Sequence, residues 1–161
     1  MTVTKEFLLP LHKHYYVGDI GYVLEDEDFN AILINQDPPT GVHTYKGHKF
    51  FLLTDGPGDG TFPMDDLTDL DDEDYESGLS GFMVDCGTWG ILPLEMLNQE
   101  WLEDDLFKFG FVIGMTRDEI DYGEGVDEFD VSVVYSPDGF PLNVDFAGYR
   151  VNVQNPLGVI F

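Results

Sequence analysis

The stretch FDVSVVYSPDGFPLNVDFAGYRVNV at residues 129–153 decides the fold. Apolar and polar residues alternate at its start, which predicts a half-buried β-strand. The residues that share the apolar face are Phe129, Val131, Val133 and Tyr135. Residues 136–139 (SPDG) predict a turn. Residues 142–146 then return as the partner strand, and residues 148–153 form another strand, so the stretch predicts an antiparallel sheet.

Further strands and two helices are predicted on the N-terminal side of this stretch. The expected strands are 5–17, 20–24, 81–84, 88–92 and 107–115, and residues 44–54 are β-rich with a possible hairpin turn near Gly47. Residues 25–35 predict a helix because their acids lie in the first turn, where the helix dipole favours them. Residues 93–105 predict the best helix, with Pro93 in its first turn and apolar residues at 3–4 spacing. The expected core is Leu94, Leu97, Trp101, Phe109, Phe111, Val131, Val133, Val144, Phe146 and Val151.

Together these elements predict one acidic domain over residues 1–161. Its expected class is α+β, mostly antiparallel β-sheet arranged as a sandwich or roll, with one or two short helices. Apolar residues make up 43% of the chain, enough to bury a core. The acidity is therefore expected on the surface of a folded domain.

The charge balance excludes several classes of function. The chain has 7 Lys and Arg against 32 Asp and Glu, a formal charge of −25. Direct binding to nucleic acid or to an anionic membrane is disfavoured, because both depend on Lys and Arg. No apolar run reaches the length of a transmembrane helix. The N-terminus lacks the apolar core of a signal peptide, and the single cysteine, Cys86, fits a reducing compartment. We therefore expect a cytoplasmic protein.

No catalytic motif is present, so we expect no enzyme, no cofactor and no bound metal. The serines do not lie in a Gly-x-Ser-x-Gly motif. The histidines lack the spacing of a zinc site; they are His12, His14, His43 and His48. An EF-hand register that starts at Asp69 fails at its glycine and at its last glutamate. An irregular calcium site from Asp55, Asp59 and the acids of 65–74 stays open as an alternative.

Two acidic windows dominate the charge. The first, DDLTDLDDEDYE at 65–76, has eight acids in twelve residues, and the second, DEIDYGEGVDEFD at 118–130, has seven in thirteen. Tyrosines within them can anchor a partner through aromatic contacts. The sequence therefore predicts a partner-binding surface made of Asp65, Asp66, Asp69, Asp71, Asp72, Glu73, Asp74, Tyr75, Glu76, Asp118, Glu119, Asp121, Tyr122, Glu124, Asp127 and Glu128.

The leading functional hypothesis is an interaction protein whose carboxylates stand in for phosphates. It would be a DNA mimic, or an inhibitor of a basic nucleic-acid-binding protein or nuclease. The alternatives are a calcium- or ligand-binding β-module or a structural protein, with acidity as an adaptation to salt. Acids collected on one face would favour mimicry, and a uniform spread would favour salt adaptation.

Three segments resemble a family of small bacteriophage and bacterial proteins. They are YYVGDIGYVLEDEDF at 15–29, GDGTFP at 58–63 and VDCGTWGILPLEML at 84–97. The family pattern is a Gly-Asp-x-x-Tyr-Val start, a Gly-Asp-Gly-x-Tyr loop and a Val-Asp-x-Gly stretch that leads to Ile-Pro. Phe62 stands where the pattern has tyrosine. The resemblance implies a phage or bacterial source and a partner in the host cytoplasm, such as a defence nuclease, and it transfers no catalytic residue.

Overall fold

The computed structural model describes two β-sheets and a segment that covers one of them. The described residues are 2–11, 14–34, 39–55, 60–66, 81–84, 88–97, 110–114 and 125–153. All strand pairings among them are antiparallel. This confirms the predicted mostly antiparallel sheet structure.

The six-stranded sheet combines strands from both ends of the described chain with two strands from its middle. Its order is β1 (Val3–Pro10), β9 (Glu128–Tyr135), β10 (Pro141–Phe146), β11 (Tyr149–Asn152), β5 (Gly60–Asp66) and β6 (Gly81–Val84). Strands β9, β10 and β11 are consecutive neighbours, as residues 129–153 predict. The turn between β9 and β10 closes where it is predicted, because the Gly139 amide donates to the Ser136 carbonyl at 2.9 Å.

The five-stranded sheet is built from the middle of the chain. Its order is β3 (Gly41–Tyr45), β4 (His48–Leu53), β7 (Trp89–Pro93), β2 (His14–Asp19) and β8 (Gly110–Gly114). Helical turns join some of these strands: the 3-10 turn η1 (Ile20–Tyr22), the helix α1 (Asp26–Phe29), the π-helical turn η2 (Asn30–Ile34) and the 3-10 turn η4 (Leu94–Met96). The helical segment α1–η2 confirms the helix predicted at 25–35.

The two sheets pack face to face through one large hydrophobic core. The apolar face predicted for β9 is buried in this core along its whole length. Trp89 of β7 packs edge-on against Phe51 and Phe82, with ring centroids 6.3 and 5.1 Å away. Phe82 belongs to the other sheet, so the Trp89–Phe82 pair joins the two. Edge-to-face pairs of this kind stabilise a core by about 0.5–1.5 kcal/mol beyond the area that they bury.

The predicted core is largely confirmed. Its buried members are Leu97, Val131, Val133, Val144, Phe146 and Val151. Leu94 is partly buried against a second hydrophobic cluster. Trp101, Phe109 and the side chain of Phe111 lie outside the described residues.

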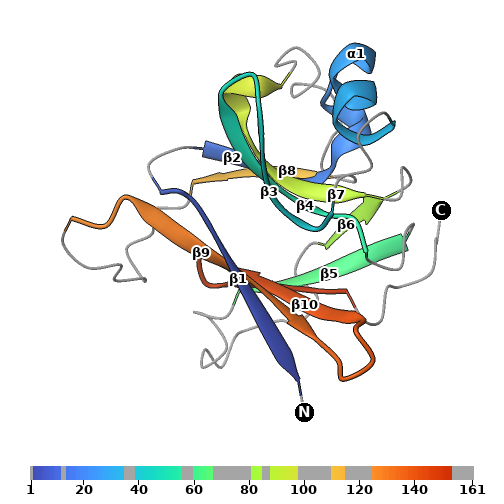
Figure 1. The fold of residues 1–161 in the computed structure, drawn as a ribbon, viewed down its shortest axis with the longest axis vertical. Coiled ribbons are helices and arrows are strands. Elements are labelled where there is room, and N and C mark those ends of the chain that lie inside the picture. The colour runs from blue at the N-terminus through green and yellow to red at the C-terminus, as the bar shows by residue number, and fades with distance from the viewer. Residues whose placement is uncertain are drawn as a thin grey trace.

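The second cluster covers the face of the five-stranded sheet that points away from the core. Its sheet residues are Tyr16, Phe50, Leu52 and Leu92, and its covering residues include Ile20, Val23, Leu24 and Ile32. Figure 1 shows α1 over this sheet, on the side away from β9 and β10. The described part of the chain thus has three layers, with the helical segment, the five-stranded sheet and the six-stranded sheet in that order.

Two strand predictions near the N-terminus are wrong. Residues 5–17 form two strands, β1 and β2, that belong to different sheets. Residues 20–24, predicted as a strand, begin instead with the turn η1. The cause is Asp19, whose carboxylate accepts a hydrogen bond from the Gly21 amide at 2.7 Å and caps that turn.

The helix predicted at 93–105 does not form over its described part. Pro93 ends β7, residues 94–96 make a single 3-10 turn, and Leu97 has extended backbone angles. Residues 98–105 lie outside the described residues. Strand β5 is not predicted from the sequence, because Pro63 cannot donate to a strand ladder. Pro63 lies opposite Gly81, at the end of the pairing between β5 and β6.

Candidate functional site

The register of the six-stranded sheet places the described ends of both acidic windows at one end of the sheet. Asp65 at the end of β5 lies opposite Arg150 of β11, and Arg150 lies opposite Asp145 of β10. Asp145 in turn lies opposite Ser132 of β9. Because neighbouring strands run in opposite directions, β5 finishes at the end of the sheet where β9 begins with Glu128.

This acidic end of the six-stranded sheet comprises the last residues of β5 and the first residues of β9, with the β10–β11 turn between them. Adjacent strands lie about 4.8 Å apart, so three strand spacings separate β5 from β9 by about 14 Å. Asp65 and Asp66 end the first of these strands, and Glu128 and Asp130 begin the second. The acids of the second strand are exposed. The windows therefore meet the sheet close together, although Asp66 and Glu128 are about sixty residues apart in the chain.

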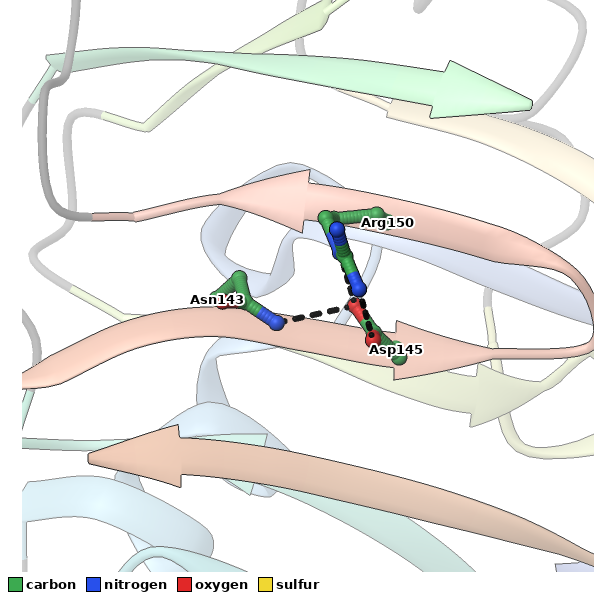
Figure 2. A network of polar contacts seen from close by, with 3 residues as sticks. All are labelled: Asn143, Asp145 and Arg150. Carbon is green, nitrogen blue, oxygen red and sulfur yellow. Dashed lines mark hydrogen bonds and ion pairs between the residues drawn. The ribbon is translucent and has the colours of Figure 1, made fainter. Parts of the chain in front are cut away.

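A row of polar residues crosses the outer face of the six-stranded sheet. Figure 2 shows its centre, where the Arg150 guanidinium meets the Asp145 carboxylate through two nitrogens, Nε and Nη2, each 2.9 Å from a carboxylate oxygen. The Asn143 amide donates to the same carboxylate at 3.0 Å. Paired donors of this kind hold the carboxylate in one orientation. The charge of Arg150 is therefore balanced on the sheet itself.

The predicted partner-binding residues divide into two groups. Asp65, Asp66, Asp127 and Glu128 lie in the described part of the chain, at or beside the acidic end. The others lie outside the described residues; they are Asp69, Asp71, Asp72, Glu73, Asp74, Tyr75, Glu76, Asp118, Glu119, Asp121, Tyr122 and Glu124. The structure thus brings together the described members of both windows.

A second polar group joins the two sheets and is not predicted from the sequence. The Thr40 hydroxyl accepts a hydrogen bond from the Thr54 amide at 2.9 Å and donates one to the Asp55 carboxylate at 2.5 Å. Tyr135 of the other sheet bonds to the same group, and burial, then the charge of Asp55, raises its pKa to about 12. Its phenol stays protonated at neutral pH and serves as a hydrogen-bond donor. No motif marks these residues, because they meet only through the packing of the sheets.

The structure bears on two further classes of site, metal centres and membrane-spanning helices. Within the described ranges, no three His, Cys, Asp or Glu side chains lie close enough together to hold a metal ion. Asp55 and Asp59 are both ligands in the alternative of an irregular calcium site. Asp55 takes part in the Thr40–Tyr135 group, and Asp59 lies outside the described residues. None of the described helices is both long enough and apolar enough to span a membrane.

The outer face of the six-stranded sheet and its acidic end are thus the candidate site. The chain matches no family model, no curated protein and no solved structure.

Proposed function

We propose that the protein is a non-enzymatic interaction protein that presents carboxylates to a basic partner. In its sharpest form it is a DNA mimic that inhibits a nucleic-acid-binding protein or nuclease. The observation that supports this most is the strand register, which brings the described ends of both acidic windows to one end of one sheet. Acids spread evenly over the surface would not be brought to one end of one sheet in this way.

The number of acids in the two windows suits this proposal. A DNA duplex carries one negative charge per about 1.7 Å of axis, so fifteen acids match the charge of about 25 Å of duplex. The two windows hold eight and seven acids. Dense charge of one sign also speeds association with an oppositely charged protein at low salt. The resemblance to phage proteins favours a host defence protein as the target.

One observation favours the alternative of salt adaptation. Four consecutive acids, Glu25–Asp28, lie at the start of α1, on the opposite side of the molecule from the outer face of the six-stranded sheet. Asp28 is neutralised locally, because it accepts hydrogen bonds from Tyr45 at 2.8 Å and Lys46 at 3.2 Å. Acids on both sides of a protein are what adaptation to a salty environment would produce.

The deciding experiment neutralises the first window as a block. Asp69, Asp71, Asp72, Glu73 and Asp74 are changed together to Asn or Gln, and binding to core histone dimers is measured by fluorescence anisotropy. Histones bind DNA through a basic surface without reading its sequence. We expect wild-type protein to bind, to compete with duplex DNA, and to weaken as salt rises.

The block variant should lose at least tenfold in affinity and keep its fold. Each exposed ion pair contributes only about 0.2–1 kcal/mol, so single changes should have small effects. Absence of wild-type binding, or full binding by the block variant, would overturn the proposed mimicry. If the acidity is instead an adaptation to salt, the block variant should keep any histone binding and lose solubility at high salt.

A further inference from the structure

The two sheets differ in which of their faces can meet a partner. The outer face of the five-stranded sheet is covered by the helical segment and its hydrophobic cluster. In the described part of the chain, no hydrophobic cluster lies on the outer face of the six-stranded sheet. A flat partner surface therefore has access to the outer face of the six-stranded sheet.

One corner of that face combines acids with an exposed apolar side chain. Leu8 of β1 is 48% exposed and lies directly opposite Asp130 of β9. On the same face, the next pair on one side of Leu8 and Asp130 is Pro10 with Glu128. The next pair on the other side is Glu6 with Ser132. All three acids are exposed. We call Glu6, Leu8, Glu128 and Asp130 the β1–β9 corner.

This combination is typical of a binding surface. Interfaces bury apolar anchors inside a rim of polar and charged residues. Leu8 at the corner has acids on its own strand and on the neighbouring strand, so a partner that covers Leu8 also meets those carboxylates. The nearest described cation on the inner side, Lys5, is directed over the Tyr135 ring, 5.1 Å from its centroid. The corner itself is therefore acidic.

We propose that the β1–β9 corner is the docking surface for the basic nucleic-acid-binding face of a partner protein, with Leu8 as its apolar anchor. This inference rests on the proposed function and adds where on the molecule the partner sits. Charge complementarity selects the occupant, since a second copy of a chain with charge −25 would be repelled. A Lys- or Arg-rich surface with one apolar contact would match the corner.

The test compares two pairs of matched variants in the histone-binding assay. Glu128→Gln with Asp130→Asn removes two of the three charges of the corner, and Glu27→Gln with Asp26→Asn makes the same change in charge on α1. All four residues are exposed. We expect the corner variant to lose about tenfold in affinity and the α1 variant less than twofold.

The apolar anchor has its own matched control. Leu8→Ala is compared with Val112→Ala, because Val112 is 46% exposed on β8 of the other sheet. The Leu8 variant should lose about tenfold in affinity, as expected for an interface anchor, and the Val112 variant should bind like wild type. Circular dichroism and thermal melting verify that each variant is folded.

The outcomes separate this inference from the proposed function. Equal losses in the corner and α1 variants, together with intact binding by Leu8→Ala, would overturn the docking site and leave a charge-driven interaction in place. A wild-type protein that binds no histone would overturn the proposed function itself. Losses confined to the corner variants would support both.

Discussion

At the scale of single residues, the most informative side chain is one that the sequence does not mark. Tyr135 belongs to the predicted apolar face of β9, and the alternating pattern correctly places it in the core. The pattern gives no sign that its hydroxyl would meet Thr40 and Asp55, because those residues come from another sheet. Periodicity predicts which side of a strand is buried, and it carries no information about the partners across the core.

Tyr135 predicts a loss of stability at alkaline pH. Its pKa is raised from 10.0 to about 12, so the folded state favours the neutral phenol. That contribution is fully present below about pH 10 and is lost as the pH rises towards 12. Tyr15, whose pKa is also raised by burial, acts in the same direction. The urea concentration at the midpoint of unfolding should therefore decrease as the pH rises from about 10 to about 12.

Tyr135→Phe removes the titrating group and should flatten this pH dependence without abolishing it. Its midpoint should be lower than that of wild type near neutral pH, because the variant leaves Thr40 and Asp55 without one partner. An unchanged slope between about pH 10 and pH 12 would show that Tyr135 does not carry the effect.

At the scale of elements, the correct predictions are those that depend on residues close together in the sequence. Strands that alternate, such as β9, and turns with Gly or Pro, such as 136–139, are predicted correctly because their signal is local. The helix predicted at 93–105 does not form over residues 93–97, because apolar residues also fit extended chain: Leu97 is buried beside the sheet without helical geometry. The acidic end depends on pairings between distant strands, which no local pattern contains.

The glycines of β2 and β8 give a prediction at this scale. Gly110 lies opposite Gly18, and a Cβ at Gly110 would come within 2.5 Å of the Tyr16 ring and of the Val17 carbonyl. Gly110→Ala should therefore lower the free energy of unfolding by about 3 kcal/mol through overpacking. Chemical denaturation measures this change.

A double-mutant cycle identifies the cause. In a Tyr16→Leu background the loss from Gly110→Ala should shrink, because the ring that it strikes is absent. Gly47→Ala provides the control: its positive φ of 83° costs about 1 kcal/mol, no atom lies within 4 Å of the new Cβ, and its effect should add to that of Tyr16→Leu. Additivity in the Gly110 cycle would contradict a clash with Tyr16.

At the scale of the whole molecule, the net charge of −25 sets the response to salt. Repulsion among acids opposes folding, and salt screens it over a distance of about 10 Å at 0.1 M and about 3 Å at 1 M. We expect the melting temperature to rise over the first few tenths of molar NaCl and then to level off. Histone binding should weaken over the same range.

The same titration distinguishes the two explanations of the acidity. A protein adapted to salt would keep gaining stability up to molar KCl and would remain soluble there. A charge-mimicking protein would be folded at low salt, where its partner binds most tightly. Differential scanning fluorimetry across the salt series, run beside the binding assay, measures both responses on one sample.

The alternation along β9 has a consequence for how the protein can evolve. Odd-numbered positions from 129 to 135 fill the core, and the even-numbered residues Asp130 and Ser132 face outwards. Mutations at the outward positions can therefore change recognition without disturbing the packing inside. If the protein is the inhibitor that we propose, such a strand allows it to change its contact residues repeatedly as its target changes, while natural selection preserves the same scaffold.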